Sequence, residues 1–475
     1  MIEKTELEFN GLKKILYYSI AIMILWLGVV SIRMHFSPDE FEHIHSAWLV
    51  LNGYVPFKDF FQNHNPLFWY TIAPFIKIFG NTITTVISLR IFMLFLTVMI
   101  GYVTYKIGFS ITNSKNVGLL AMGLLLTTEM FYHRSIEVRP DVPQVLFGMI
   151  AIYYLLSFLK TNRTIEICLS GFCLALSFLF LQKSIFLIMM VFLLIGWKIY
   201  KKEIRFLDAI WIFGAFLIPL IIYGIYLMGT ESIRDYLMFS WISNFKRENP
   251  FSPFKMIFRW LSSSNLWFLM PAALLRLWVP VNNNRSFDLK FLSFVGLGVI
   301  ASTFLVPHPF SQYFMMMIPP MCLVNADYLY GKLQQGFSQK FKVFVIVFVL
   351  FVPLVNLALV TRSSNERELK IVDYITKQTT ANDYVYDLSY NLFRKDPHFL
   401  WMVRSGLIWS SNYATNNRYK HYDPAEVIKE KWPRFVNEAF VNSKNGLDKY
   451  YEKSPYSGIA VRKDTPIPVF KEKQP

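Results

Sequence analysis

The sequence predicts an all-α polytopic membrane protein that ends in a small α/β domain outside the membrane. Apolar runs of about 18 residues or more recur between Leu12 and Val360, each near the length that a bilayer demands. Beyond Arg362 the composition becomes polar and charged. These runs exclude a soluble enzyme, a disordered chain and an outer-membrane barrel, whose segments alternate in polarity over about ten residues. The predicted domains are therefore 1–361 in the membrane and 362–475 outside it.

Hydropathy predicts about eleven transmembrane helices, with the N-terminus inside. The first is an uncleaved span, because its apolar stretch exceeds the core of a signal peptide and no small-residue cleavage site follows it. Segment Pro66–Gly80 is apolar but only about fifteen residues long, which predicts an interfacial or re-entrant helix. The predicted spans are 12–34, 82–105, 117–133, 141–159, 165–181, 184–200, 207–228, 263–281, 291–306, 311–330 and 343–361.

The distribution of charge orients these spans. The chain carries 48 Lys and Arg against 32 Asp and Glu, a net charge of +16. On the predicted topology the short inner loops are basic and nearly free of acid, as the positive-inside rule expects. Because no compact basic, aromatic-rich module is present, the excess favours anionic lipids and phosphate-bearing substrates over nucleic acid. These inner loops lie around 106–115, 160–163, 198–205, 282–290 and 332–342.

The first outer loop, 35–81, holds the most suggestive polar residues. Pro38 and the acids after it favour a helix start, with Ser37 as N-cap. Carboxylates at a helix N-terminus stay ionised, so Asp39 and Glu40 are available as bases or ligands. The alternative is that both acids only cap a surface helix.

The polar tail has the periodicity of a mixed domain. Glu366–Lys377 repeats apolar residues at helical spacing through Leu369, Val372 and Ile375, and Tyr384–Leu388 has the composition of a strand. A small α/β domain is therefore predicted on the outer side, because an odd number of spans places the C-terminus there.

Four motifs follow one another in order along the membrane region. Their register resembles the polyprenyl-phosphate-sugar-dependent glycosyltransferases of the GT-C fold, the family 39 type related to protein O-mannosyltransferases and to the lipid A aminoarabinose transferase. The resemblance covers nearly all of the membrane region and only loosely the tail. The motifs are Asp39-Glu40 with Gly53-x-x-Pro56-x-x-Asp59-Phe-Phe-x-x-His64-x-Pro66-Leu; Glu137-x-Arg139-Pro140-Asp141; Gln182-Lys183; and His308-Pro309-x-x-Gln312-Tyr313 before Ile318-Pro-Pro.

This resemblance implies transfer of a sugar from undecaprenyl or dolichyl phosphate to an acceptor at the outer face of the plasma membrane, usually with inversion. Asp39 is then the expected general base, and Glu40 orients it or contacts the acceptor. A departing lipid phosphate is stabilised by fixed cations. His64 stands where the family has a basic residue before the Pro-Leu pair. The expected donor-phosphate or substrate contacts are Lys58, His64, Arg139, Asp141, Lys183, His308 and Tyr313.

Structural roles compete with these assignments. Arg139 and Lys183 have the alternative of snorkelling to the interface, and Lys58 that of lying in solvent. His308 and Asp141 have the alternative of capping helices. Arg90 lies within an apolar span, where an arginine is costly and usually faces a partner or a cavity, which the sequence does not name. The aromatic segment 236–260 is compatible with an interfacial belt or with a lid.

A divalent cation, Mg²⁺ or Mn²⁺, is a further alternative, since Asp39, Glu40 and His43 lie within one helical turn. No His-x-x-x-His or Cys pair supports it. No nucleotide-binding glycine loop is present, which argues against a nucleotide-sugar donor and against ATP coupling. The competing functions are an O-antigen ligase or polymerase, a flippase or transporter of lipid-linked sugars, and a non-catalytic scaffold. The acceptor, whether lipid, glycan or protein, is left open.

Overall fold

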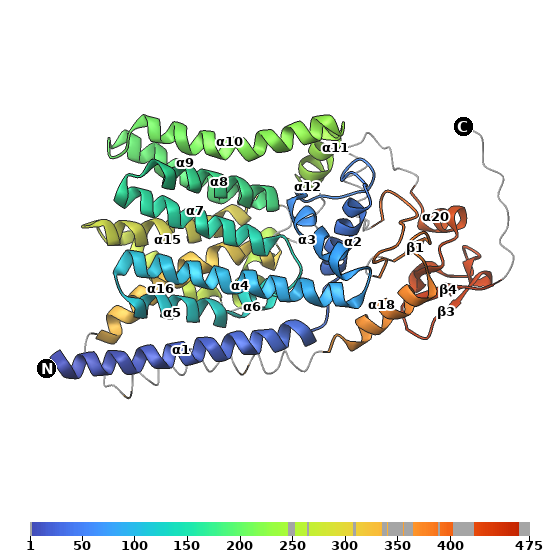
Figure 1. Cartoon of the computed structure of the whole chain (residues 1–475), viewed down its shortest axis with the longest axis horizontal. Helices are drawn as coiled ribbons and strands as arrows, with labels where there is room; N and C mark the ends of the chain where they lie inside the picture. Colours follow the sequence, from blue (N-terminus) through green and yellow to red (C-terminus); the bar gives the residue numbers. More distant parts are fainter. Residues whose placement is uncertain are drawn as a thin grey trace. The chain divides into compact units, whose positions relative to one another are not determined.

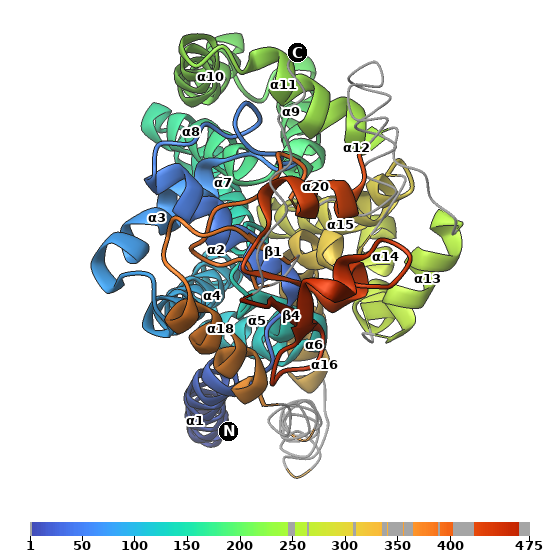
Figure 2. The same ribbon diagram turned by 90° about the vertical axis from the view of Figure 1, so that its right-hand side faces the viewer.

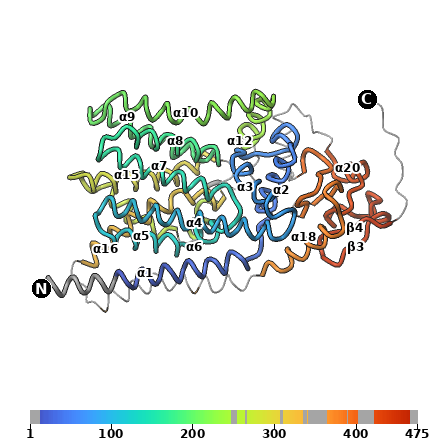
Figure 3. The backbone as a smooth tube through the Cα atoms, in the orientation of Figure 1, coloured from blue at the N-terminus to red at the C-terminus, as the bar shows by residue number. Residues whose placement is uncertain are grey.

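A computed structural model describes residues 2–245, 252–263, 266–306, 310–334, 364–387, 390–401 and 422–464, with the single residues 340 and 355 (Figure 3). Its contacts divide the chain into two compact units, each assembled from segments far apart in the sequence. The predicted domain boundary after residue 361 stays a prediction. Unit 1 comprises Met1–Met34, Arg90–Ile225 and Asn249–Ser363, and unit 2 comprises His35–Leu89, Tyr226–Glu248 and Ser364–Pro475.

Unit 1 is a bundle of helices that run back and forth along one direction (Figure 1), and Figure 2 looks along several of them. The predicted mostly helical architecture is confirmed. Its helices are α1 (Ile2–Arg33), most of α4 (Ile83–Thr112), α5 (Lys115–Thr127), α6 (Glu129–Ser135), α7 (Asp141–Thr161), α8 (Thr164–Phe180), α9 (Ile185–Tyr200), most of α10 (Phe206–Gly229), α13 (Pro253–Ser263), α14 (Met270–Trp278), α15 (Asn284–Thr303) and α16 (Ile318–Gln334), with short turns η1 (Gln182–Ser184), η3 (Leu266–Leu269) and η4 (Ser311–Met317).

Among the described residues, six helical segments are long and apolar enough to cross a membrane. The chain is therefore a multi-pass membrane protein, while the predicted number of eleven spans stays a prediction. The predicted span 343–361 lies outside the described residues, apart from residue 355. The six candidates are Lys13–Arg33, Ile83–Thr112, Asp141–Thr161, Gln182–Tyr200, Phe206–Gly229 and Asn284–Thr303.

The alternation of helix direction brings the basic connections of unit 1 to one end. In Figure 1 the connections α4–α5, α7–α8 and α9–α10, and the start of α15, all lie at the left end of the bundle. These connections carry lysines and arginines such as Lys115, Arg163, Lys202 and Arg285. One end of unit 1 thus has the charge that the positive-inside rule assigns to a cytoplasmic face.

The intramembrane arginine of the sequence has main-chain partners within unit 1. Arg90 is fully buried, and its Nη1 donates to the carbonyl oxygens of Ser31 at 3.1 Å and Met34 at 2.6 Å. These carbonyls belong to the last turn of α1 and the residue after it, where helical carbonyls lack a partner and the helix dipole is negative. Arg90 therefore caps the C-terminal end of α1.

Unit 2 contains the first outer loop together with the described part of the tail. The predicted tail helix and strand are confirmed, with the strand shorter than expected. Its elements are α2 (Pro38–Leu51), α3 (Leu67–Phe79), the start of α4, α11 (Ile233–Tyr236), the π-helical turn η2 (Leu237–Ile242), α12 (Ser243–Phe245), α18 (Glu366–Gln378), β1 (Val385–Tyr386), α20 (Pro424–Lys431), β2 (Phe435–Asn437), η5 (Glu438–Phe440), η6 (Leu447–Lys449), β3 (Tyr451–Lys453) and β4 (Ile459–Arg462).

The four strands form a sheet in the order β1-β2-β4-β3, parallel between β1 and β2 and antiparallel elsewhere. Successive strand residues point to opposite faces, so Val385 and Tyr386 enter different cores. Val385 packs with Ile371 and Ile375 of α18, whereas Tyr386 packs in a cluster with Ile428 of α20. One helix therefore covers each face of the sheet.

The tail segment before the sheet is packed against the first outer loop inside unit 2. His45 Nε2 lies 2.8 Å from Asp396 Oδ2, and both side chains are buried. The Phe61 N–H donates to the Phe399 carbonyl at 3.0 Å, and the Trp401 ring centroid lies 4.8 Å from that of His45. The segment 396–401 thus helps to fix α2 and the loop around Phe61 that follows it.

Candidate functional site

The turn between α6 and α7 places two predicted residues at one end of a candidate span. Its sequence is Glu137-Val-Arg139-Pro140-Asp141, and α7 begins at Asp141 directly after the proline. Proline fixes a backbone torsion that suits the first turn of a helix, and a carboxylate there is favoured by the helix dipole. Both Arg139 and Asp141 are buried, at 4% and 1% exposure.

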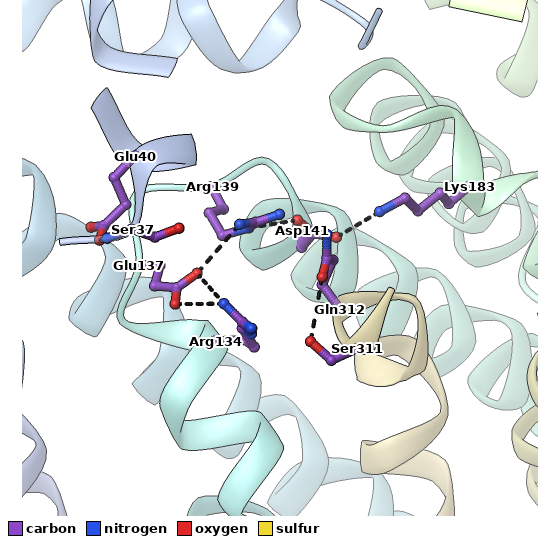
Figure 4. A network of polar contacts seen from close by, with 9 residues as sticks. All are labelled: Ser37, Glu40, Arg134, Glu137, Arg139, Asp141, Lys183, Ser311 and Gln312. Carbon is purple, nitrogen blue, oxygen red and sulfur yellow. Dashed lines mark hydrogen bonds and ion pairs between the residues drawn. The ribbon is translucent and has the colours of Figure 1, made fainter. Parts of the chain in front are cut away.

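Alternating charges link this turn into one network (Figure 4). Arg134 Nη1 lies 2.8 Å from Glu137 Oε1, and Arg139 Nη1 lies 3.4 Å from Glu137 Oε2. Arg139 Nε then donates to Asp141 Oδ2 at 3.3 Å. Asp141 thus holds the guanidinium of Arg139 in place. This contact goes beyond the alternative role of Asp141, which was only to cap the helix.

Lys183 approaches Asp141 from the short turn η1. Its Nζ lies 3.3 Å from Asp141 Oδ1 and 3.8 Å from the ring centroid of Tyr313 in η4. The predicted residues Arg139, Asp141, Lys183 and Tyr313 therefore come together, although they span 174 positions of sequence (313 − 139). The lysine side chain is only 13% exposed, which argues against simple snorkelling into water.

The network gathers cations that suit an anion. Arg139 and Lys183, which are nearly buried, and the partly exposed Arg134 lie around the carboxylates of Glu137 and Asp141. Arginine and lysine with phosphate oxygens form strong charge-assisted hydrogen bonds. A very small cavity beside it, of about 10 Å³, is lined in part by Lys183, Gln312 and Tyr313.

The carboxylates of the first outer loop lie at the N-terminus of α2, as predicted. Glu40 is buried, and one of its oxygens accepts the Ser37 N–H at 2.9 Å, so it caps the helix. Asp39, the predicted base, is partly exposed in the first turn. The capping contact gives Glu40 a structural role, while the position of Asp39 leaves its carboxylate at a surface of unit 2.

Two predicted phosphate contacts from the same loop have different surroundings. Lys58 is exposed, and its Nζ lies 3.2 Å from Glu231 Oε2 and 3.1 Å from the Thr230 carbonyl. It lines an open, mostly polar pocket of about 800 Å³ that also includes Asp59 and His398. His64 is partly exposed and lies with its ring centroid 5.7 Å from that of His43. The predicted contact His308 lies outside the described residues.

The donor groups that lie close together in the structure differ from the predicted cation ligands. Instead of Asp39, Glu40 and His43, the atoms that lie within 4.8 Å of one another belong to Glu42, His43 and His64. However, the Trp69 indole N–H donates to His43 Nδ1 at 3.2 Å, so a neutral His43 carries its proton on Nε2. A metal-bound histidine normally has the reverse arrangement, with its second nitrogen as a donor. His43 therefore fits a metal poorly, and no catalytic step is assigned to a cation.

Several residues of these clusters gave no signal in the sequence. Arg134 carries no motif of its own, and Trp69 looks like any other apolar residue of Pro66–Gly80. Asp396 lies 351 positions from His45, in a tail for which only a helix and a strand were predicted. Only the fold brings these residues to the predicted ones.

Comparison with known proteins shows what this chain resembles. A family model described as dolichyl-phosphate-mannose-protein mannosyltransferase matches residues 63–223, a segment that includes His64, Arg139 and Lys183. The crystal structure of ArnT from Cupriavidus metallidurans bound to undecaprenyl phosphate has a similar fold, with a TM-score of 0.65 over 94% of this chain and 97% of that chain. Over residues 63–223 this chain is similar to the mannosyltransferase family, and its fold is that of ArnT.

A second crystal structure of ArnT, without the lipid, is equally similar to this chain. ArnT from Cupriavidus metallidurans in the apo state gives a TM-score of 0.66 over the same shares of the two chains. The identity is 10% in both comparisons, which shows a shared fold and no more. A search of curated protein sequences gives no match. The resemblance predicted from the four motifs is confirmed, while the roles of individual residues stay predictions.

Proposed function

We propose that this glycosyltransferase moves a sugar from a polyprenyl phosphate to an acceptor at the extracytoplasmic face of the plasma membrane, with inversion. One observation carries the proposal, namely the buried network in which Asp141 holds Arg139 and Lys183 side by side. A monoester phosphate leaving group gains negative charge as its bond to the sugar breaks, and fixed cations stabilise that charge. The similar fold of a protein crystallised with undecaprenyl phosphate supports a lipid-phosphate donor.

Each group has one task in the proposed reaction. The Asp39 carboxylate takes the proton from an acceptor hydroxyl, whose oxygen attacks the anomeric carbon of the sugar. The bond from that carbon to the phosphate oxygen breaks, and its electron pair leaves with the polyprenyl phosphate. Arg139 and Lys183 bind the departing phosphate. Attack opposite the leaving group inverts the anomeric configuration.

A matched pair of variants tests the assignment of Asp39. The full chain and Asp39→Asn are purified in detergent and compared for release of polyprenyl phosphate from radiolabelled lipid-phosphate sugars, with a membrane extract as acceptor. Loss of a general base typically costs about 10²–10⁴-fold in rate, so Asp39→Asn is expected to lose transfer and keep donor binding. Asp59→Asn is the control, since Asp59 is an exposed acid of the same loop whose Oδ2 accepts the Val55 N–H.

The outcomes separate the competing functions. Equal release by wild type and Asp39→Asn removes the catalytic role of Asp39 but leaves a transferase. Sugar that crosses vesicle membranes still attached to its lipid, without release of polyprenyl phosphate, indicates a flippase instead. Label that appears only in long glycan chains built from a lipid diphosphate donor indicates a ligase or polymerase.

A further inference from the structure

An apolar groove lies in unit 1, and none of its lining residues is used in the proposed reaction. Its volume is about 430 Å³, and it is formed by the C-terminal half of α9, the end of α14 and the first half of α15. Leu193 and Trp197 of α9 line one side, and Leu277, Phe291 and Phe294 line the other. Lys290 is the single charged residue in its lining.

The walls of this groove suit a hydrocarbon chain. Leu193, Trp197 and Phe294 are 61%, 45% and 43% exposed, so the groove opens outward on helices that are apolar enough to span a membrane. In a bilayer the surroundings of such helices are lipid chains rather than water, and an open apolar groove there is filled by a chain. Stacking of the Trp197 and Phe287 rings, 6.1 Å apart and tilted by 7°, gives the groove a flat wall.

The charge at one end of the groove favours an anionic headgroup. The neighbouring acids are each paired with a cation, as Glu203 is with Lys198, Asp288 with Lys160 and Asp327 with Arg285. Among the described residues Lys290 makes no ion pair, and its Nζ donates only to the Val279 carbonyl at 3.4 Å. Lys198 lies nearby, with its Nζ 3.8 Å from the ring centroid of Phe287.

We infer that this groove binds one anionic phospholipid, with an acyl chain along Leu193, Leu277 and Phe291 and the phosphate at Lys290. The basic connections gather at the same end of unit 1, which is the end that meets an anionic leaflet. The bound lipid is a structural partner that is separate from the sugar donor. Its site therefore holds whether or not the proposed transfer reaction is correct.

Lipid retention by the full chain tests the inference. The protein is reconstituted in nanodiscs of equal parts phosphatidylglycerol and phosphatidylcholine, moved to a mild detergent, and examined by native mass spectrometry. Wild type is expected to keep one phosphatidylglycerol. Leu193→Trp fills the groove and is expected to lose both lipids, while Ile222→Trp, at a comparably exposed position on α10, keeps the wild-type pattern. Lys290→Gln is expected to lower the preference for phosphatidylglycerol about fivefold.

Four results would overturn the inference. If wild type keeps the two lipids equally, it has no anionic site. If Leu193→Trp keeps phosphatidylglycerol as wild type does, the lipid binds elsewhere. Displacement of the retained lipid by an equal amount of polyprenyl phosphate would assign the groove to the donor chain. Inorganic phosphate, added as a competitor, is expected to leave the lipid in place, because the acyl chain supplies most of the binding. Release of the lipid by phosphate alone would also contradict binding in the groove.

Discussion

Arg90 Nη1 lies 2.6 Å from the main-chain oxygen of Met34, so a guanidinium in one apolar helix caps the end of another. A second hydrogen bond to the Ser31 carbonyl comes from the same nitrogen. This relationship explains how an arginine is tolerated within a candidate span, since its charge meets the negative end of a helix dipole instead of lipid.

Replacement of this arginine is expected to destabilise unit 1. In Arg90→Met the carbonyls of Ser31 and Met34 lose a charged donor in a dry environment, which costs roughly 2–4 kcal/mol. The midpoint of thermal unfolding in detergent measures the effect. Arg163→Met, at an exposed arginine in a connection of the same unit, is the control and is expected to stay within about 0.5 kcal/mol of wild type. Equal midpoints for both variants would show that the cap contributes nothing.

Lys183 is expected to bind the donor phosphate. Loss of one charged hydrogen-bond partner costs about 1.5–3 kcal/mol, so Lys183→Met should weaken binding of polyprenyl phosphate by roughly 10- to 100-fold. Isothermal titration of the detergent-solubilised protein measures the affinity. Lys332→Met, at an exposed lysine of α16, serves as control. Unchanged affinity in Lys183→Met would remove Lys183 from the phosphate site and leave it as a partner of Asp141 alone.

Acidification is expected to loosen the tail segment through His398. Burial lowers the pKa of this imidazole below its usual value of 6.5, and its Nδ1 accepts the Leu400 N–H at 3.0 Å. The unfolded chain therefore takes up the proton first as the pH falls. Stability from the neutral ring is complete above about pH 6.5 and is lost as the pH falls through the lower pKa of the folded state.

Unfolding midpoints between pH 7.5 and 5 test this dependence. Wild type is expected to lose stability over that range more steeply than His398→Gln, which keeps a hydrogen-bonding side chain without the titration. His35→Gln is a suitable control, because His35 is exposed in the same unit. A pH profile of His398→Gln that is identical to wild type would assign the acid sensitivity to other groups.

A glycine of α8 is expected to be irreplaceable by alanine. A Cβ on Gly171 would lie 2.2 Å from the Ile212 carbonyl oxygen of α10, far inside van der Waals contact. Gly171→Ala must push the two helices apart, and overpacking of this kind costs about 1–3 kcal/mol or more. Gly196→Ala is the matched control, since a Cβ there meets nothing within 4 Å and alanine raises helix propensity. The two variants should therefore move the unfolding midpoint in opposite directions.

Much of the helical architecture was predictable, because the length of an apolar run is a local property of the chain. The predicted spans 141–159 and 207–228 correspond closely to α7 and α10. The boundaries were less accurate where helices break, as in the predicted span 117–133, which the structure divides into α5 and α6 around Thr128. The turn at Thr128 depends on packing between segments, which periodicity does not report.

The candidate site was predictable only residue by residue. The motifs predicted Arg139, Asp141, Lys183 and Tyr313 as site residues, but no motif predicts that Asp141 pairs with both cations. That arrangement depends on where η1 and η4 lie beside the start of α7, and Arg139 and Tyr313 are linked through Asp141 and Lys183 only in the folded bundle. For the same reason the sequence named Asp39 and Glu40 with His43 as cation ligands, whereas the folded chain gathers Glu42, His43 and His64.

The sequence by itself determined what depends on composition and local order: a multi-pass membrane protein, a polar tail with a helix and a strand, and a resemblance to the GT-C glycosyltransferases. The tertiary structure alone decided which charges pair, that Arg90 caps α1, and that Asp396 meets His45. The physical reason is the range of the forces concerned. Hydropathy and helix propensity act along neighbouring residues, whereas ion pairs and hydrogen bonds require atoms within about 3–4 Å of each other, a distance that only the packed chain sets.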